Sequence, residues 1–448
     1  MRVFLRVSAH GVRACVAIGS VLAVTSCGGG ADSTMGYSVG GTVSGLITAG
    51  LVLENNSEVL TVGADAASFT FRLRLDPGAG YAVTVQHQPT TRDQLCDVGG
   101  GSGTMGSASV TTVSVVCRAS QWAVSTLAGT GAAGAIDGAA HSATFDAPFG
   151  VAVDVAGNLY VADGNNLKIR KITPSGAVTT LAGSGGSGHS DGIGAEASFS
   201  GPYAVAVDSN GNVYVAEPST HTIRRVDANG VVTTLAGSPW TAGSADGAGA
   251  AALFSSPRGV AVDGTGNVYV ADSSNSTIRK ITPAGLVSTL AGSAGAFGST
   301  DGMGGAATFN VPYGLAVDRE GTVYVADTFN NTVRKITPAG LVSTLAGSSG
   351  AFGSTDGTGA AALFRSPFGT TVDASGNVYV ADVGNLKIRK ITSAGVVTTL
   401  AGSGVLGSAN GVGAAASFNG PLGVAVDAVG VLYLADVNNN RIRKVVAQ

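Results

Sequence analysis

Apolar residues along this chain either alternate with polar ones or cluster in short runs, and Gly, Pro, Asn and Asp bound the runs. This pattern is typical of short β-strands joined by tight turns. In one stretch it predicts strands at 258–263, 267–272, 277–282 and 286–292. Asp263-Gly264-Thr265-Gly266 joins the first two strands, and its glycines supply the positive φ that such a turn needs. The pattern therefore predicts an all-β chain with antiparallel strands.

This unit of four strands recurs six times between residues 124 and 448. A Val-Asp pair marks each copy, with its aspartate at Asp154, Asp208, Asp263, Asp318, Asp373 and Asp427. Consecutive copies are 54 or 55 residues apart, and a repeat of this length restricts the architecture to a stacked array or a closed ring. Four antiparallel strands repeated radially form a propeller blade. We expect a six-bladed β-propeller over 121–448.

The two ends of the repeated region predict how the ring closes. The sixth copy ends after its third strand, and an unpartnered fourth strand at 124–129 precedes the first copy. Pairing that strand with the last copy removes the exposed sheet edges that an open array leaves. We therefore expect the last blade to combine one N-terminal strand with three C-terminal strands.

The repeated motif resembles a known family. It stands as Pro-Phe-Gly-Val-Ala-Val-Asp, followed by Gly-Asn-Leu-Tyr-Val-Ala-Asp and Lys-Ile-Arg-Lys-Ile, between Pro148 and Ile172, and recurs with small changes in every later copy. This pattern is similar to the NHL repeat, the unit of a family of β-propellers. The resemblance implies the propeller fold. It leaves the function open, because the family includes protein-binding and RNA-binding propellers, sugar or peptide sensors and a few enzymes.

The N-terminus predicts export. Arg2, Arg6 and Arg13 form a basic segment, an apolar stretch follows, and Val24-Thr25-Ser26-Cys27 resembles a bacterial lipobox. We expect residues 1–26 to be a lipoprotein signal peptide, Cys27 to be lipidated, and 27–35 to be a flexible tether in the cell envelope. The residue after Cys27 is not Asp, which favours the outer membrane, with a periplasmic or surface-facing orientation. The alternative is an ordinary cleaved secretory signal.

A second small domain is predicted at 36–118. Its strand-like segments are 42–46, 51–54, 60–62, 69–75, 81–86 and 110–116, and their order resembles small immunoglobulin-like or transthyretin-like β-sandwiches of bacterial surface proteins. Cys96 and Cys117 are the cysteines left after the signal and the lipid site. In an oxidising compartment they are expected to form a disulfide worth about 3 kcal/mol. We interpret this domain as a spacer, with a second binding module as the alternative.

Several polar and aromatic positions recur in every copy. Arginine stands in each third strand and a carboxylate seven residues before it, as in Asp272 and Arg279. This spacing favours an Asp–Arg link within the blade, and a ring of charges along the central channel is the alternative. A phenylalanine, such as Phe254, stands three residues before the proline of each inner strand and is expected to wedge between blades. One carboxylate in each Asp-Gly loop, such as Asp246, is too few for a calcium site.

Because repeated positions build the scaffold, residues that break the repeat are better functional candidates. The loops after the second and fourth strands of each blade open on one face. Exposed aromatic side chains beside amides suit recognition of a protein, peptide or glycan, and the alternative is that the aromatics fold back onto their own loops. The candidate ligand-binding residues are His189, His221, Trp240, Phe297, Phe329, Asn330, Phe352, Asn385 and Asn439, with Leu406 at a matching position.

Charge and motifs narrow the function. Removing the three signal arginines from 25 basic residues leaves 22 against 28 acidic ones, a net charge of about −6, so nucleic acid is not an expected partner. The histidines of the repeated region are not repeated, and no hydrolase, zinc or phosphate-loop motif occurs. We therefore expect a monomeric, lipid-anchored binding module with no catalytic residues, metal or cofactor. The alternative is a metal-dependent lyase or lactonase with its site in the channel.

Overall fold

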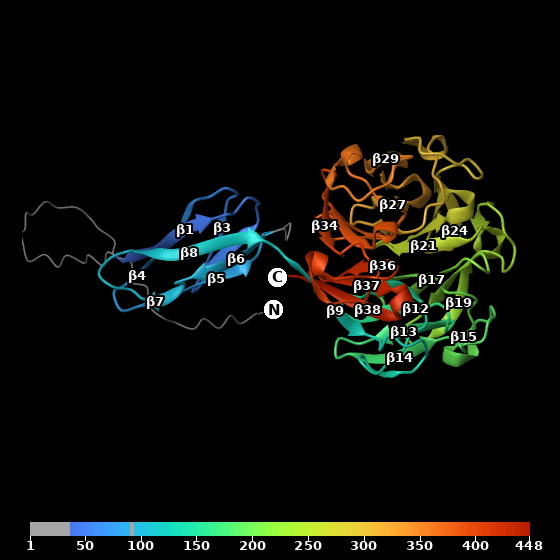
Figure 1. Cartoon of the computed structure of the whole chain (residues 1–448), viewed down its shortest axis with the longest axis horizontal. Helices are drawn as coiled ribbons and strands as arrows, with labels where there is room; N and C mark the ends of the chain where they lie inside the picture. The colour runs from blue at the N-terminus through green and yellow to red at the C-terminus, as the bar shows by residue number, and fades with distance from the viewer. Residues whose placement is uncertain (1–35, 90–93) are drawn as a thin grey trace, which may run out of the picture.

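The computed structural model describes residues 36–89 and 94–448. The predicted signal peptide, the lipid-acceptor Cys27 and the tether lie outside the described residues. Within the described ranges, no helix is long and apolar enough to cross a membrane. Figure 1 shows two parts, a small β-domain formed by the first eight strands and a ring of sheets formed by the rest of the chain.

The small domain contains two four-stranded sheets. Strands β4, β1, β8 and β6 form one sheet in that order, and β3, β2, β5 and β7 form the other. The strands are β1 (Tyr37–Ser44), β2 (Leu51–Asn55), β3 (Glu58–Val62), β4 (Ser68–Leu75), β5 (Gly80–His87), β6 (Gln94–Gly99), β7 (Ser102–Thr104) and β8 (Val110–Ala119). All six predicted strands are present. The pattern missed β6 and also β7, which is only three residues long.

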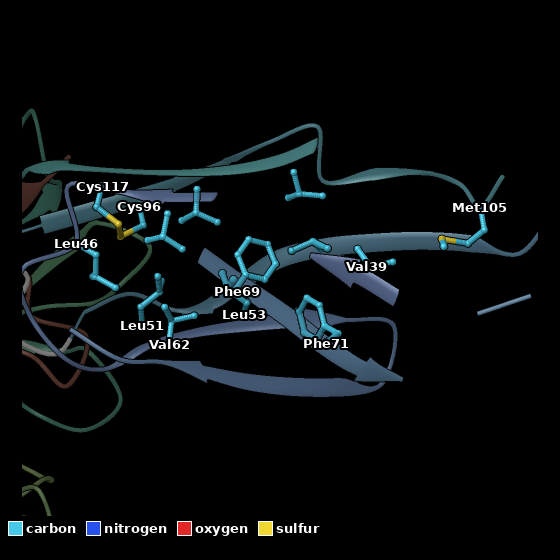
Figure 2. Packing of buried hydrophobic residues seen from close by; sticks show 14 residues of the cluster. Val39, Leu46, Leu51, Leu53, Val62, Phe69, Phe71, Cys96, Met105 and Cys117 are labelled. Atoms are coloured by element: carbon cyan, nitrogen blue, oxygen red, sulfur yellow. A yellow bond between two sulfur atoms is a disulfide. The ribbon is translucent and has the colours of Figure 1, made fainter. Parts of the chain in front are cut away.

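The two sheets share one hydrophobic core. Figure 2 shows its buried side chains, among them Leu53, Phe69 and Phe71, with the disulfide at one end of the cluster and Met105 at the other. Cys96 of β6 and Cys117 of β8 are directly opposite each other in the sheet and form the predicted disulfide. The bond therefore connects two neighbouring strands of one sheet beside the core.

The rest of the chain forms six five-stranded sheets arranged like a propeller (Figure 1). Their innermost strands are β11 (Pro148–Val153), β16 (Ala204–Val207), β21 (Pro257–Val262), β26 (Leu315–Val317), β31 (Pro367–Val372) and β36 (Pro421–Val426). The second strands are β12 (Leu159–Asp163), β17 (Val213–Glu217), β22 (Val268–Asp272), β27 (Val323–Asp327), β32 (Val378–Asp382) and β37 (Leu432–Asp436). The predicted strand bounds in the third copy agree with the structure to within one residue.

The outer strands complete each sheet. The third strands are β13 (Lys168–Ile172), β18 (Thr222–Val226), β23 (Thr277–Ile281), β28 (Thr332–Ile336), β33 (Lys387–Ile391) and β38 (Arg441–Ala447). The fourth strands are β14 (Ala177–Ala182), β19 (Val231–Ala236), β24 (Leu286–Ala291), β29 (Leu341–Ala346), β34 (Val396–Ala401) and, for the last sheet, β9 (Trp122–Ala128). All these neighbours pair antiparallel, so the loops after the second and fourth strands open on one face, which we call the upper face.

A fifth strand at the outer edge of each sheet was not predicted. These strands are β10 (Gly138–Ala139), β15 (Gly192–Ile193), β20 (Gly247–Ala248), β25 (Gly302–Met303), β30 (Gly357–Thr358) and β35 (Gly411–Val412). The 3-10 turns η1 (Gly194–Glu196), η2 (Gly249–Ala251), η4 (Gly304–Ala306), η6 (Gly359–Ala361) and η8 (Gly413–Ala415) follow five of them. Four more, η3 (Ser273–Asn275), η5 (Thr328–Asn330), η7 (Val383–Asn385) and η9 (Val437–Asn439), lie after second strands. Two residues are too few to produce a visible hydrophobic period.

The N-terminal strand of the repeated region joins the last sheet, as predicted. Strand β9 pairs antiparallel with β38 and with β35. Gln121 and Gln448 extend the pairing with two reciprocal backbone hydrogen bonds of 2.8 and 2.7 Å. The first and last innermost strands, β11 and β36, also contact each other. The two ends of the repeated region are therefore held in one sheet.

Phenylalanines pack between neighbouring sheets, which confirms the predicted wedge. Phe145 is fully buried in a cluster with Val151 and Leu159 of the first sheet and Ala435 and Ile442 of the sixth. The equivalent Phe199, Phe254, Phe309, Phe364 and Phe418 are also fully buried. The interior of the ring is thus a series of similar apolar clusters, one between each pair of sheets.

Candidate functional site

The repeated arginines form buried networks within the sheets. Arg279 donates from Nη1 to Asp272 Oδ2 at 2.9 Å and from Nη2 to Asp246 Oδ1 at 2.6 Å, and it also donates to the carbonyls of Leu253 and Ala245. Its guanidinium lies 5.2 Å from the centre of the Phe254 ring. The matching Arg170, Arg224, Arg334, Arg389 and Arg443 are likewise fully buried. This confirms the link within the sheet, and the alternative of a charged channel is wrong.

The network also explains the Asp-Gly loops. Asp246 accepts hydrogen bonds from Arg279 and from the backbone and side chain of Thr289, and these bonds hold its pKa below the usual range although burial raises it. Burial raises the pKa of Asp272 to about 6, against the hydrogen bonds from Asn275 and Ser255 and the charge of Arg279. Both carboxylates are therefore ionised at neutral pH and engaged with protein groups.

Three predicted site amides belong to this framework. Asn330 Nδ2 donates to Gly298 O at 2.6 Å and to Asp327 Oδ2 at 2.7 Å. Asn385 and Asn439 make the same two bonds in the next two sheets. These amides connect the loop after the second strand to the long loop after the fourth. They are engaged within the fold and are not part of the candidate site.

The two predicted histidines are engaged as well. The His189 side chain is 10% exposed, and its Nε2 and Nδ1 lie 3.1 Å from Thr234 Oγ1 and 3.3 Å from Arg224 Nη1. His221 Nδ1 accepts a hydrogen bond of 3.0 Å from the backbone N–H of Ser256 in the next sheet. Burial lowers the pKa of His221, so the neutral ring that this bond needs is favoured. Both histidines therefore stabilise loops.

The side chains that line the central channel are mostly apolar. Its cavity, about 170 Å³ in volume, is lined by three consecutive residues from each innermost strand, mostly valine and alanine. The fifth sheet differs, since Thr370 and Thr371 stand there, and the buried Thr370 Oγ1 has no hydrogen-bond partner in the described part of the chain. Across residues 36–89 and 94–448, no group of three or more His, Cys, Asp or Glu side chains could hold a metal ion.

A collar of large side chains stands above this cavity at the start of the innermost strands. Each member directly follows the proline of its repeat: Phe149, Tyr203, Arg258, Tyr313, Phe368 and Leu422. Phe149 stacks on Tyr203 with ring centres 4.9 Å apart, and Tyr313 stacks on Phe368 at 4.3 Å. The Arg258 guanidinium lies between the two pairs, 5.6 Å from the Tyr203 ring and 4.8 Å from the Tyr313 ring. Five neighbouring members thus form one continuous stack.

The backbone is tight at the collar. A Cβ on Gly259 would lie 2.0 Å from Tyr313 O, and one on Gly314 would lie 2.2 Å from Phe368 O. Glycine is therefore required at these two positions, whereas the second sheet has Ala204 at the equivalent place. Burial raises the pKa of Tyr203 to about 12, against the charge of Arg258, so its hydroxyl stays neutral. Sequence reasoning missed the collar, and the signal was available: only this position changes between aromatic, basic and aliphatic residues among the copies.

The four predicted aromatic residues are exposed on the upper-face loops. The exposed fractions of Trp240, Phe297, Phe329 and Phe352 are 60%, 59%, 58% and 64%. Phe329 also meets the collar, with its ring centre 6.4 Å from that of Tyr313. We call these four residues and Leu406, which is 65% exposed, the apolar rim. The alternative that the aromatics fold back out of solvent is wrong.

The rim is uneven around the ring. Phe297, Phe352 and Leu406 stand four residues before the Asp-Gly or Asn-Gly pair of three consecutive long loops, and the other three loops have Ala133, Ser187 and Ala242 there. Exposed apolar side chains gathered on one side of a face are typical of an interaction site. The candidate functional site therefore consists of the apolar rim together with the collar.

Comparisons with known proteins agree with this architecture. Residues 254–281 and 418–445 match the family model of the NHL repeat. The chain is 30% identical over 335 residues to NHL repeat-containing protein 2 of Bos taurus, covering 66% of this chain and 46% of that protein. It is 30% identical over 272 residues to the chloroplastic protein SUPPRESSOR OF QUENCHING 1 of Arabidopsis thaliana, covering 57% and 26%. The chain thus spans less than half the length of these relatives.

Solved structures share the fold. A structural genomics protein of unknown function from Bacteroides thetaiotaomicron superposes with a TM-score of 0.59 at 22% identity, covering 89% of this chain and 90% of that one. An auxiliary nutrient binding protein from the same organism superposes with a TM-score of 0.57 at 15% identity, covering 92% and 98%. At these identities the likeness shows the fold alone.

Proposed function

We propose that this NHL-repeat protein is a binding module of the bacterial cell envelope, with a six-bladed propeller carried on a small β-sandwich of immunoglobulin-like or transthyretin-like type. The lipid on Cys27 anchors it, and the exposed apolar side chains of the upper face provide the ligand contacts. The upper face holds a protein, peptide or glycan. The observation that carries the proposal is the solvent exposure of the apolar rim at positions where the repeats differ.

Two observations support binding over chemistry in the channel. The channel is lined by valine, alanine and two threonines, side chains that do not serve as metal ligands or general bases here. The rim, in contrast, presents apolar side chains that a bound partner would cover. Removing apolar surface from water is favourable by about 25 cal/mol per Å² of buried area. Two solved propellers of similar fold, from Bacteroides thetaiotaomicron and Bacteroides ovatus, are named auxiliary nutrient binding proteins. Their names support a binding role for this fold.

The alternative is a metal-dependent lyase or lactonase with its site in the channel. That chemistry needs side chains that hold a metal, and the described residues place valine, alanine and threonine at the channel wall. Elemental analysis of protein purified without added ions tests it. A stoichiometric ion that is lost on substitution of a channel residue would overturn the binding-module proposal.

The proposed face is tested by removing two rim residues. We expect Trp240→Ala with Phe329→Ala to abolish recovery of the partner that the unmodified protein cross-links in its native envelope. Val155→Ala is the matched control, because Val155 is 89% exposed in the turn after β11, on the opposite face. Unchanged cross-linking by the double variant would show that the upper face is not the binding surface.

A further inference from the structure

The collar contains a cation without an acidic partner. None of the carboxylates in the described residues forms an ion pair with Arg258, whose guanidinium is held between the rings of Tyr203 and Tyr313. The buried arginines of the sheets differ, since each is paired with a carboxylate, as Arg279 is with Asp272. Arg258 also forms a side-chain hydrogen bond with Tyr203, and a guanidinium fixed by two aromatic rings holds its remaining edge donors in a defined plane, which suits a carboxylate.

Other basic side chains surround the same face. Arg365 lies 5.3 Å from the centre of the exposed Phe352 ring. Lys387 Nζ is 3.3 Å from Ser354 Oγ, and Arg441 Nη2 donates to Thr130 O at 3.2 Å. Ser354 and Thr130 lie in long upper-face loops. Across the described ranges, none of these three side chains forms an ion pair. The upper face therefore combines exposed apolar groups with unpaired positive charge, although the whole chain is acidic.

The rim favours a polypeptide over a sugar. The amides that would bind sugar hydroxyls, those of Asn330, Asn385 and Asn439, already donate to carbonyls and carboxylates of the fold. The exposed groups that remain on the rim are three phenyl rings, the Trp240 indole and the Leu406 side chain. Such groups complement the apolar side chains of a peptide, which need no hydrogen bonds.

From these observations, and resting on the proposed function of the upper face, we infer that the ligand is an acidic polypeptide segment with Phe- or Leu-like side chains. Its apolar side chains cover the rim. One carboxylate of the segment accepts hydrogen bonds from Arg258 at the collar. Phe329 connects the two parts, because its ring contacts Tyr313, which also stacks against Arg258.

The test uses a displayed library of random linear peptides selected on the full-length protein. We expect the selected sequences to be enriched in Asp or Glu together with Phe or Leu. One selected peptide is then also made with the matching amide in place of its carboxylate, and we expect this change to weaken binding roughly tenfold. The Arg258→Gln variant should weaken binding of the original peptide by a similar factor. The two changes together should weaken it little further, because they remove the same interaction. Arg319→Gln, which removes an exposed arginine from a turn on the opposite face, is the matched control.

The outcomes separate this inference from the proposed function. If Trp240→Ala with Phe329→Ala abolishes peptide binding and Arg258→Gln does not change it, the face is correct and the carboxylate contact is wrong. If neither variant weakens binding, the proposed face itself fails. Selected peptides without acidic residues, or binding to an oligosaccharide array with no peptide selected, would overturn the acidic polypeptide. The amide peptide leaves the protein unaltered, so the test stays decisive even if Arg258→Gln unfolds the collar.

Discussion

The hydrogen bond from Ser256 to His221 provides a direct test of how neighbouring sheets are held together. The residue before each third strand has a left-handed backbone, with φ of 61° at His221, 56° at Asn331 and 51° at Asn440. Each of these three side chains accepts a hydrogen bond from a backbone N–H of the next sheet, at 3.0, 2.8 and 2.9 Å. In the first and fifth sheets the equivalent residue is leucine, which has no acceptor.

The perturbation is His221→Leu, which copies the residue at positions 167 and 386. Leucine adopts the same backbone there, with φ of 55° and 56°, so the loop conformation is not at issue. The substitution leaves the N–H of Ser256, a half-buried residue, without its partner, and an unsatisfied donor of this kind costs about 1–3 kcal/mol. We expect His221→Leu to reduce the free energy of unfolding of the ring by that amount.

The structure also predicts a rescue. Ser256 has a φ of 48°, in the left-handed region that favours glycine. In the two sheets that follow a leucine, the residue equivalent to Ser256 is Gly201 or Gly420. Because a non-glycine residue in this region costs about 1 kcal/mol or more, adding Ser256→Gly to His221→Leu should recover roughly that amount.

Urea unfolding followed by tryptophan fluorescence measures this effect. The chain has two tryptophans, Trp122 and Trp240, and both lie in the ring, so the signal reports the propeller and not the small domain. His221→Asn is the matched control, because asparagine makes the same bond at positions 331 and 440. Equal unfolding midpoints for His221→Leu and the unmodified protein, or equal losses for His221→Leu and His221→Asn, would refute the reasoning.

Three further predictions concern charge and closure. Burial lowers the folded-state pKa of His221 below 6.5, so its contribution to stability is lost as the pH falls below about 6.5, and His221→Asn should flatten the fall of the urea midpoint between about pH 7 and 5. Arg389→Met leaves Asp382 buried and unpaired and should cost about 3–5 kcal/mol in the same unfolding assay. Asp356→Asn should cost less than about 1 kcal/mol, because that side chain is 48% exposed; equal losses would contradict the prediction. Deleting 124–129 should unfold the ring cooperatively, measured by hydrogen exchange, and a loss of protection confined to β37 and β38 would contradict closure through β9.

The repeat spacing predicted most of the fold because strand, turn and wedge residues recur at fixed intervals. The link between Asp272 and Arg279 was also predictable, since both residues lie on neighbouring strands of one sheet. The roles of His221 and Asn330 were not, because their partners lie in other loops, 35 and 32 residues away, and only the folded ring brings them together. The position of His221 performs its task in four of the six sheets, through His221, Ser276, Asn331 and Asn440, and Asn330 recurs as asparagine in four other copies.

The collar shows the opposite case. Its position recurs in every copy, but the residue there varies and no single structural role explains the variation. Gly259 and Gly314 show that the backbone around the collar is nearly the same in neighbouring sheets, so the backbone does not require an arginine at 258. Arg258 stands between two stacked aromatic pairs, and the apolar rim lies on one side of the same face, where Phe297, Phe352 and Leu406 follow one another. A ligand bound here contacts the sheets unequally. Binding such a ligand therefore requires differences among the copies at only a few positions, and the other repeated positions stabilise the ring.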